Sequence, residues 1–249
     1  MKQIAHIESV YKSKFGVPRQ AGLVDVEARV VFEPEYRVAE AVRGLDEFDY
    51  IWLVWGFHQN KVDKLNVDKL DISTHQRINV STQWSPTVRP PRLGGNKRVG
   101  VFATRSPYRP NPIGLSSVRL LRVAQEAGQG PVLYVGGADL VDGTPIYDIK
   151  PYIPYADSHP DARGGFAQQA PEMLRVEIAD DLLQQLPEEL HRPLSESLAL
   201  DPRPHYQDDP QRRYTMPFDR WEVRFRVENG VVKVEALVLN KVKTATKCL

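Results

Sequence analysis

The amino-acid sequence predicts a mainly β fold, in which an antiparallel barrel is followed by a small α+β unit. Its first two-thirds hold short runs of β-branched and aromatic residues, which glycines, prolines and polar clusters separate. No long helices lie between these runs, and this favours an antiparallel barrel over a sheet of βαβ units. After about Gly165 the pattern changes to a helix and a hairpin. The 249 residues, 41% of them hydrophobic, suffice for one large domain or for a larger and a smaller one.

The first part holds seven segments with the composition of strands and one with that of a short helix. The helix is expected at Glu35–Val42, because Pro34 precedes it and Gly44 follows it. The segment Lys61–Trp84 contains a repeat of Val-Asp-Lys-Leu and is expected to be a solvated excursion between strands. The predicted strands are Gln3–Tyr11, Val24–Phe32, Tyr50–Phe57, Arg98–Ala103, Ser117–Val123, Val132–Val135 and Ile146–Ile153.

The carboxy-terminal third is predicted to contain a leucine-faced helix and a hairpin. Leucines at positions 182, 186, 190, 194 and 198 share one face of a helix over Asp180–Leu200, which Pro187 and Pro193 must divide or kink. Trp221–Val227 alternates apolar and polar residues, and Val231–Leu239 follows after Asn229-Gly230, a pair typical of a hairpin turn. We therefore expect two domains, 1–165 and 166–249, the second ending in a basic tail over Asn240–Leu249.

The positive charge of the chain is concentrated in one stretch. Between Ile72 and Gln125 there are nine Arg and Lys residues and no acidic residue, whereas the net charge of the whole chain is only +1. The molecule is therefore electrically polarised. Within Thr104–Leu115, prolines restrict the backbone around Arg105 and Arg109 and so present guanidinium groups to an anion in fixed directions. The alternative is a proline-rich surface loop whose charges are solvated.

Several common sequence motifs are absent, and their absence disfavours disulfides, metal centres and nucleotide-binding sites. Cys248 is the only cysteine, which excludes an intrachain disulfide and a cysteine metal cluster. The six histidines form no i, i+4 pair, so no catalytic metal is expected, and there is no Walker A, G-x-S-x-G or dinucleotide-binding G-x-G-x-x-G pattern. The start lacks the apolar core of a signal peptide, and no window reaches the roughly 18 apolar residues of a membrane span. We expect a soluble cytoplasmic protein.

Another polar group follows the basic stretch, at Asp142-Gly143-Thr144-Pro145, which has the composition of a tight turn. If Ile146–Ile153 is a strand, its residues divide between two faces. In one interpretation the polar face lines the mouth of a pocket; in the other it faces solvent and carries an exposed ion pair. The two faces are Ile146, Asp148, Lys150 and Tyr152 on one side, and Tyr147, Ile149, Pro151 and Ile153 on the other.

Two shorter polar groups stand at the ends of predicted strands. Pro18-Arg19-Gln20 closes the loop after the first strand, and His58-Gln59 ends the third. Each group is either the exit of the chain to solvent or a set of amides that reads the edge of a nucleobase. Composition alone does not choose between these interpretations.

Taken together, these motifs resemble those of the TsaA-like (YaeB) family, whose characterised bacterial members N6-methylate threonylcarbamoyladenosine at position 37 of tRNA. The resemblance implies a seven-stranded antiparallel barrel that binds S-adenosylmethionine without a Rossmann fold. It also implies a homodimer with the cofactor near the subunit interface. The sequence departs from the family at Lys61–Trp84, where related enzymes have a shorter connection. The motifs are Pro18–Gln20, His58-Gln59, Arg89–Asn96, Thr104–Leu115, Asp142–Pro145, Asp148–Tyr152 and, in the carboxy-terminal third, Asp201–Pro204.

The resemblance also implies which residues bind the cofactor. They come from the loop after the first strand, the end of the third strand, the proline-rich segment and the tight turn. By similarity they are Pro18, Arg19, Gln20, His58, Gln59, Arg105, Leu115, Leu140, Val141, Asp142, Gly143, Thr144 and Pro145.

The implied acceptor is a urea-like nitrogen, a poor nucleophile while it keeps its hydrogen, so a nearby base would assist the transfer. Asp148 and Asp142 are the acidic candidates, and either carboxylate could instead stabilise the cationic cofactor. Our hypothesis is that Asp148, positioned by Lys150 and Tyr152, forms part of the acceptor site.

The implied substrate is anionic, because the modified base brings a carboxylate and the anticodon arm brings phosphates. Arg105 and Arg109 suit bidentate recognition of such groups, and Tyr108 and Tyr152 are candidate stacking platforms. Arg119 and Arg122 are expected to extend the positive field. The predicted RNA-binding residues are Arg89, Arg92, Lys97, Arg98, Tyr108 and Arg109.

Two other functions compete with this one. The first is a non-catalytic RNA-binding barrel, in which the Asp142 turn is purely structural and S-adenosylmethionine does not bind. The second is an enzyme of the same barrel that methylates a different acceptor.

Overall fold

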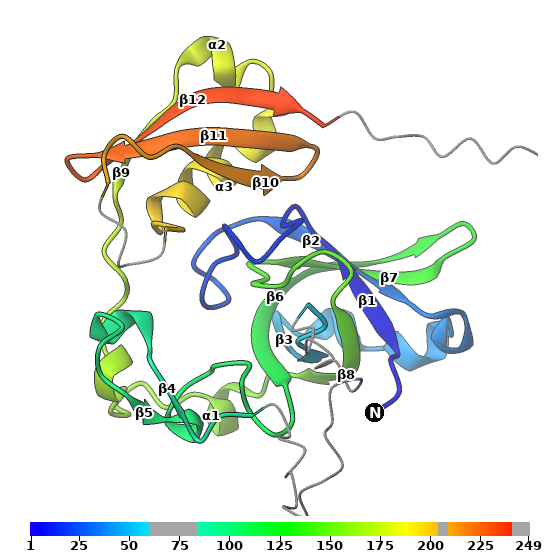
Figure 1. Cartoon of the computed structure of the whole chain (residues 1–249). Coiled ribbons are helices and arrows are strands. Elements are labelled where there is room, and N and C mark those ends of the chain that lie inside the picture. Colours follow the sequence, from blue (N-terminus) through cyan, green and yellow to red (C-terminus); the bar gives the residue numbers. More distant parts are fainter. Residues whose placement is uncertain (60–83, 204–208, 241–249) are drawn as a thin grey trace, which may run out of the picture.

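The computed structural model describes residues 1–59, 84–203 and 209–240 (Figure 1). The predicted excursion Lys61–Trp84 lies outside the described residues except for Trp84, and so does the predicted basic tail except for Asn240. No helix in the described ranges is long and apolar enough to cross a membrane.

A closed antiparallel barrel forms the first part of the chain (Figure 1). The alternation predicted for strands is present: in Tyr50–Gly56, for example, Ile51, Leu53 and Trp55 point into the barrel and are buried. In order around the barrel, the strands are β1 (Ala5–Glu8), β2 (Glu27–Phe32), β7 (Gly130–Gly136), β6 (Ile113–Glu126), β3 (Tyr50–Gly56) and β8 (Pro145–Pro151).

The barrel of the described residues closes with six strands, because the strand predicted at Arg98–Ala103 is not part of it. Val99–Gly100 (β5) pairs only with Thr87–Val88 (β4) in a separate two-stranded ribbon. The chain then turns into a 3₁₀ helix, Val101–Ala103, whose Val101 carbonyl accepts hydrogen bonds from the backbone N–H and the hydroxyl of Thr104. A residue that caps a turn in this way ends the extended run that Val99 and Val101 suggest.

The helix predicted at Glu35–Val42 is also different in the structure. Two 3₁₀ helices, Pro34–Tyr36 and Ala39–Val42, replace it, and a third follows at Leu45–Glu47. The Arg37 side chain, which lies between the first two, donates its Nε–H to the Phe32 carbonyl at 2.9 Å and fixes the bend. Further short turns are Pro91–Leu93, Gly165–Ala167 and the α1 turn Pro154–Asp157.

The two faces predicted for Ile146–Ile153 are only partly correct. The pairing of β8 with β3 shifts by one residue at Val54/Trp55, so β8 contains a bulge. Ile146 and Ile149 both pack in the barrel core as a result, although strict alternation puts them on opposite faces. Asp148 and Lys150 remain together on the outer face, joined by an ion pair of 3.0 Å, whereas Ile146 does not share that face.

The carboxy-terminal part contains the predicted helix and hairpin. Pro187 divides the leucine-faced helix into α2 (Asp180–Leu183) and α3 (Glu188–Ala199), and Leu194 and Leu198 are fully buried against a four-stranded sheet. Asn229 and Gly230 adopt φ angles of 52° and 73°, as a tight hairpin turn requires. The sheet order is β10 (Tyr214–Phe218), β11 (Trp221–Glu228), β12 (Val231–Leu239) and β9 (Arg175–Glu177), with β9 parallel to β12.

The core beneath this sheet also takes residues from the amino-terminal end of the chain. Tyr11, Val24 and Val26 are buried among its side chains, so the sheet and α3 rest on the segments that precede and follow the first loop. Contacts to α3 are direct: the Tyr11 hydroxyl lies 3.1 Å from Ser197 Oγ, and the Asp25 N–H donates to Glu196 at 2.9 Å.

Candidate active site

The tight turn before β8 is fixed against the first strand and the segment that follows it. The N–H groups of Asp142 and Gly143 donate to the carbonyls of Tyr11 and Ile7, both at 2.8 Å. Thr144 is buried, and its hydroxyl donates to the Val141 carbonyl at 2.6 Å. Gly143 has a φ of 74°, and no heavy atom lies within 4 Å of the position that a Cβ would take, so the turn has open space on its outer side.

Next to this turn lies the predicted pair at the end of β3. The Thr144 hydroxyl lies 3.3 Å from His58 Nδ1, and the Lys14 ammonium donates to the Gln59 carbonyl at 2.8 Å. Desolvation, reinforced by the positive charge of Lys14 and opposed by Asp142, lowers the pKa of His58. The His58 imidazole is therefore favoured in its neutral form.

Arg105 and Gln20, predicted from separate motifs, are hydrogen-bonded to each other through the Arg105 guanidinium and Gln20 Oε1. Arg105 also acts on Asp139, a carboxylate that receives the Ser116 hydroxyl at 2.6 Å. The same Ser116 oxygen accepts the Trp55 indole N–H at 3.0 Å. Burial raises the pKa of Asp139, and the hydrogen bond from Ser116 and the charge of Arg105 oppose that rise.

The remaining predicted cofactor residues differ in exposure. Pro18 and Leu140 are buried and support their loops, whereas Arg19 is exposed. Leu115 is 54% exposed on the outer face of β6. The strand register places Leu115 opposite Val54 of β3, and Val54 opposite Asp148 of β8. Leu115 and Asp148 therefore lie in one row across three strands, about 10 Å apart between backbones.

The proposed acceptor triad is brought together in part. Asp148 Oδ2 lies 3.0 Å from Lys150 Nζ, and Asp148 Oδ1 accepts the Ile149 N–H at 3.0 Å. Tyr152 instead packs against two other rings, with centroids 5.8 Å from Trp52 and 6.1 Å from Tyr50. Along β8, Asp148 is four residues from Thr144, or about 13 Å, so it does not touch the tight turn.

The predicted RNA-binding residues lie on the ribbon and the loops around it. Arg89, Lys97 and Arg98 are exposed, and none forms an ion pair with another residue in the part of the chain that the structure describes. Arg98 donates to Thr87 Oγ1 at 2.8 Å, and Arg92 to the Gln169 carbonyl at 2.7 Å. Tyr108 is 58% exposed.

Arg109 differs from the other predicted RNA-binding residues in its contacts. Its guanidinium donates to the Thr104 carbonyl at 3.0 Å and, more weakly, to the Val101 carbonyl at 3.5 Å. The side chain therefore braces the 3₁₀ helix Val101–Ala103, and only part of its hydrogen-bonding capacity is available to a ligand.

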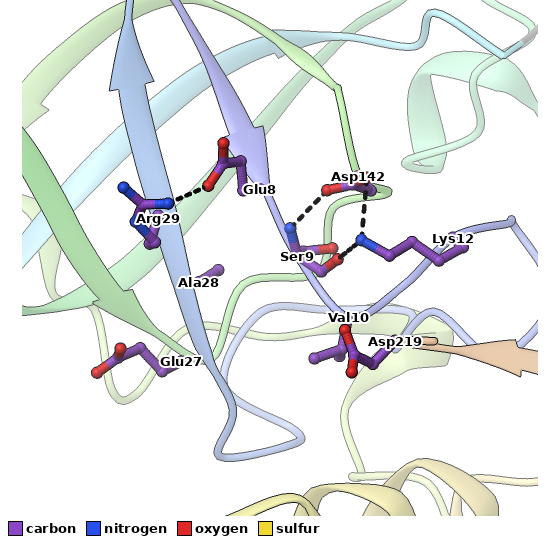
Figure 2. Close-up of a pocket in the computed structure, with 9 residues that line it drawn as sticks. All are labelled: Glu8, Ser9, Val10, Lys12, Glu27, Ala28, Arg29, Asp142 and Asp219. Carbon is purple, nitrogen blue, oxygen red and sulfur yellow. Dashed lines mark hydrogen bonds and ion pairs between the residues drawn. The ribbon is translucent and has the colours of Figure 1, made fainter. Parts of the chain in front are cut away.

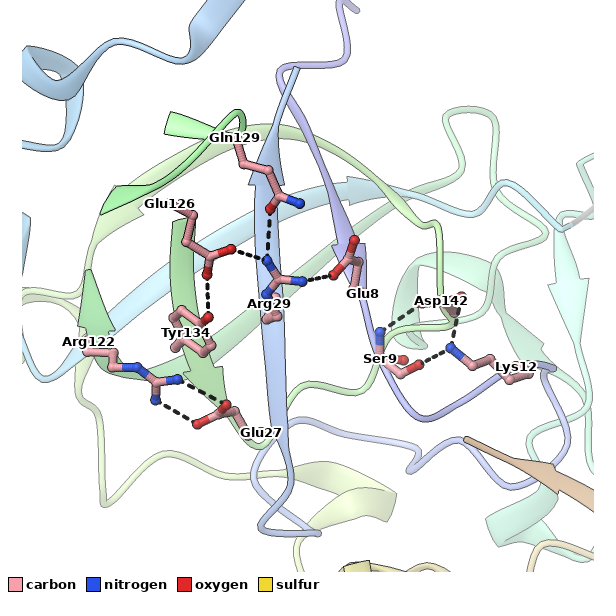
Figure 3. Close-up of polar contacts among 10 residues, drawn as sticks. All are labelled: Glu8, Ser9, Lys12, Glu27, Arg29, Arg122, Glu126, Gln129, Tyr134 and Asp142. Carbon is pink, nitrogen blue, oxygen red and sulfur yellow. Dashed lines mark hydrogen bonds and ion pairs between the residues drawn. The ribbon is translucent and has the colours of Figure 1, made fainter. Parts of the chain in front are cut away.

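Arg119 and Arg122 do not extend a positive field as predicted, because acidic residues from outside the basic stretch pair with them. Figure 3 shows the pair of Arg122 and Glu27. Arg119 lies 2.7 Å from Asp25, and Arg122 lies 2.8 Å from Glu27 and stacks on the Tyr134 ring at 3.4 Å. These pairs join β6 to the loop before β2 and to β2 itself. Their charges are therefore neutralised locally.

Three polar residues of the site region are not among the residues singled out from the sequence. Ser9 is buried; its N–H donates to Asp142 Oδ1 at 2.9 Å and its hydroxyl to the Leu140 carbonyl at 2.8 Å. Lys12 Nζ lies 3.0 Å from Asp142 Oδ2. Asp139 stands in an otherwise apolar run, Val135–Val141, and that isolated acid was a signal available in the sequence. Ser9 and Lys12 gave no such signal, because their partner is about 130 positions away.

A hollow of about 460 Å³ lies beside Asp142, between the barrel and the β10–β11 turn (Figure 2). Of the predicted cofactor residues it includes only Asp142. We therefore assign the candidate site to the side chains around the tight turn, His58 and Arg105, and not to this hollow.

The fold is that of a β-barrel protein without a dinucleotide-binding sheet. Its polar loops gather around one turn, and an α+β unit lies behind them. Residues 6–158 match the family model for the tRNA-methyltransferase O N-terminal domain, and residues 171–240 match that for the TrmO C-terminal domain. The chain belongs to the tRNA-methyltransferase O family.

Similar proteins match the chain over different lengths. A tRNA (adenine(37)-N6)-methyltransferase of Escherichia coli is 42% identical over 246 residues, covering 95% of this chain and 96% of that protein. A protein of the same name from Eikenella corrodens is 53% identical over 156 residues, covering 62% and 88%. The crystal structure of TrmO from Pseudomonas aeruginosa aligns with a TM-score of 0.70 at 29% identity, over 95% of this chain and 96% of that one.

Proposed function

We propose that this protein uses S-adenosylmethionine to methylate N6 of threonylcarbamoyladenosine at position 37 of tRNA. The observation that carries the proposal is the meeting of motifs far apart in the sequence around one turn. Thr144 reaches His58, the Asp142 backbone is fixed to the first segment, and Arg105 binds Gln20. Membership of the tRNA-methyltransferase O family, with relatives named for methylation of adenine 37, supports the same reaction.

The residues around the turn suit a cationic, partly apolar cofactor. When bound, S-adenosylmethionine supplies an electrophilic methyl group carried on a positively charged sulfur. The open space beside Gly143 leaves room for a ligand against the turn, and Leu115 offers an exposed apolar surface. Neutral His58 and the neighbouring carboxylate of Asp142 fit the positive charge. The proposed contacts are Pro18, Arg19, Gln20, His58, Gln59, Arg105, Leu115 and the turn Leu140–Pro145.

We place the methyl acceptor at the outer face of β8. There Asp148 accepts the proton that leaves the acceptor nitrogen, and Lys150, 3.0 Å away, holds the carboxylate in place. The tilted rings of Tyr152, Trp52 and Tyr50 provide an aromatic surface beside this pair, which suits an unstacked base of the anticodon loop. Asp142 is less suited to act as the base, because Ser9 and Lys12 hold its carboxylate and its side chain is less exposed than that of Asp148, 36% against 48%.

The tRNA backbone is proposed to lie along the ribbon. Arg89, Lys97 and Arg98 are exposed there, and Arg92, Tyr108 and Arg109 flank them. Contacts between these cations and phosphates supply affinity that does not depend on sequence and position the anticodon arm.

We further propose a cytoplasmic homodimer with domains 1–165 and 166–249, the first of them catalytic. Exposed apolar side chains near the candidate site support an interface there: Leu115 is 54% exposed and Phe102 is 75% exposed. Analytical ultracentrifugation tests the dimer, and a monomer at micromolar concentration contradicts it.

Two measurements test the function. Calorimetry with S-adenosylmethionine separates the enzyme from a non-catalytic RNA-binding barrel, since only the enzyme is expected to bind it. Mass spectrometry of tRNA nucleosides from cells that lack the gene then tests the acceptor. The methylated threonylcarbamoyladenosine should be absent and should return with the wild-type gene but not with Asp148→Asn. If the methylated nucleoside persists in cells that lack the gene, the proposed reaction is contradicted.

A further inference from the structure

The segment Ser9–Gln20 contacts every other group of the candidate cofactor site. Near its start, Ser9 and Lys12 both bind the Asp142 carboxylate. In its middle, Lys14 donates to the Gln59 carbonyl at 2.8 Å. At its end, Gln20 accepts a hydrogen bond from Arg105. One stretch of twelve residues thus connects the turn, the end of β3 and the proline-rich segment.

Ser9 and Lys12 fix the turn in detail (Figure 2). The Ser9 hydroxyl donates to the Leu140 carbonyl at 2.8 Å and accepts the Tyr11 N–H at 3.1 Å, while the Ser9 N–H binds Asp142 Oδ1. Lys12 Nζ joins the Ser9 carbonyl, at 2.7 Å, to Asp142 Oδ2, at 3.0 Å. A displacement of this segment therefore moves both ends of the Leu140–Asp142 stretch.

The opposite side of the same segment packs into the core of the carboxy-terminal sheet. Phe15 stacks on Tyr214 and Phe225, with ring centroids 6.4 and 6.3 Å apart. Tyr11 pairs with Phe218 in an isolated β-bridge, and its ring meets that of Phe218 edge to face at 6.1 Å. At the next turn, the Asp219 N–H donates to the Val10 carbonyl at 2.6 Å.

The segment has little structure of its own to hold it. Apart from the bridge at Tyr11, residues 9–20 belong to no strand or helix, and so no ladder of backbone hydrogen bonds fixes their path. Their conformation is set by contacts on two sides, with the cofactor turn on one and the carboxy-terminal core on the other. A change in the carboxy-terminal core therefore alters the conformational freedom of the turn, and a change at the turn alters that of the core.

We propose that the carboxy-terminal unit is a positioning element of the cofactor site, with Tyr11 and Phe15 as the positioning residues that connect its core to the turn. The proposal rests on the proposed function, since it assumes that the cofactor binds at the Leu140–Pro145 turn. It assigns this unit a role in cofactor affinity besides any contact with tRNA. Coupling between two sites is reciprocal, so the bound cofactor should in turn protect the segment and the sheet from opening.

The test uses substitutions in the carboxy-terminal sheet, distant in sequence from the cofactor residues. Phe225→Leu removes the ring under Phe15, whereas Val232→Ala creates a cavity in the same core at a fully buried residue with no hydrogen bond or ring contact to residues 9–20. Affinity for S-adenosylmethionine is measured by calorimetry on the full-length protein at 15 °C, together with the melting temperature of each variant.

The proposal predicts different effects on affinity. Phe225→Leu should weaken cofactor binding by about 5- to 50-fold, in the range of ordinary coupling between sites. Val232→Ala should lower the melting temperature to a similar extent but change affinity by less than about twofold. Hydrogen exchange in residues 9–20 should be faster in ligand-free Phe225→Leu than in the wild type.

Three results would overturn the proposal. The first is an unchanged affinity in Phe225→Leu, and the second is an equal loss of affinity in Val232→Ala. If Phe225→Leu does not fold, Tyr11→Phe replaces it, because this variant keeps the ring and removes only the hydrogen bond to Ser197. Tyr11→Phe should also weaken binding of S-adenosylmethionine. An unaltered affinity in this variant again contradicts the coupling. The third is a wild-type protein that binds no S-adenosylmethionine, which refutes the proposed function itself and is thus distinct from a failure of the coupling alone.

Discussion

Ser116 donates its hydroxyl hydrogen to Asp139 at 2.6 Å, and this bond holds a largely desolvated carboxylate at the end of the barrel next to Arg105. The two residues come from β6 and from the loop after β7. The carboxylate opposes folding when it ionises, because burial raises its pKa. A half-buried acid beside an arginine, whose charge costs stability, is typical of a functional site.

Asp139→Asn should stabilise the protein at neutral pH. The pKa of Asp139 in the fold is above its value in the unfolded chain, so the native state is favoured while the carboxyl is protonated, and that advantage is lost as pH rises through the folded pKa. Asparagine keeps an acceptor for Ser116 without the charge. In calorimetric melts, each kcal/mol gained raises the midpoint by about 2–4 °C in a chain of this size. The gain should be larger at pH 8 than at pH 4. The exposed Asp46→Asn serves as control, and equal gains at both pH values contradict this account of Asp139.

His58 should make cofactor binding sensitive to acid. Its pKa is lowered, so the imidazole is neutral at pH 7 and becomes charged only below the ordinary value of about 6.5. Affinity for the cationic cofactor should be constant between pH 8 and 7 and should fall as the pH drops through the folded pKa, since the imidazolium repels the sulfonium. The stability of the fold should depend on pH in the same direction. Above the unfolded pKa of His58 its neutral form stabilises the fold, and that contribution is lost as the pH falls through the folded pKa. Lys14, Asp142 and Thr144 surround the ring.

Calorimetric titration with S-adenosylmethionine at several pH values checks this expectation. His58→Asn, which keeps a polar side chain but cannot take up the proton, is the matched variant and should flatten the acid limb. An acid limb that survives in His58→Asn would assign the titration to another group.

Asp148→Asn should slow methyl transfer and spare cofactor binding. General-base assistance contributes about 100- to 10,000-fold to such reactions, so the single-turnover rate on modified tRNA should fall by at least 100-fold. Affinity for S-adenosylmethionine should stay within about twofold, because Asp148 lies about 13 Å along β8 from the tight turn. The exposed Asp161→Asn is the control. A full single-turnover rate in Asp148→Asn removes the residue from the acceptor site.

Replacement of both Lys97 and Arg98 by alanine should flatten the salt dependence of tRNA binding. Each phosphate contact contributes about 0.7–0.9 to the slope of log affinity against log salt, so the pair should lower it by about 1.4–1.8. Filter binding at several salt concentrations measures the slope. Arg119→Gln with Arg122→Gln is the matched control, because both arginines are already paired with acids and should leave the slope unchanged. An unaltered slope in the first variant places Lys97 and Arg98 on a merely solvated surface.

Local patterns in the sequence predicted local structure well. The hairpin at Asn229-Gly230 and the leucine-faced helix divided at Pro187 are encoded by a few neighbouring residues, and both are confirmed. The barrel itself was predictable, because alternation in segments such as Tyr50–Gly56 is strong. The assignment of Arg98–Ala103 to the barrel was wrong, because Val99 and Val101 have strand composition although a capped turn follows them.

The candidate site was predictable only where a motif carried it. The tight turn, His58 and Arg105 lie in recognisable groups, whereas Ser9 becomes a partner of Asp142 only through the fold. The charge of the basic stretch was misjudged at Arg119 and Arg122, since their acidic partners Asp25 and Glu27 lie about 95 positions earlier. Composition cannot show which charges the fold will pair.

The bulge in β8 has a consequence for how this strand can change. Ile146 and Ile149 both point inward, because the extra residue between them shifts the alternation of side chains in β8 by one position. Substitutions at Tyr147 or Asp148 keep that shift, and loss of one of the two positions would remove the bulge, restore plain alternation and leave Ile149 facing inward and Lys150 outward. This part of the barrel wall therefore accommodates both an exchange of side chains and the loss of the one extra residue.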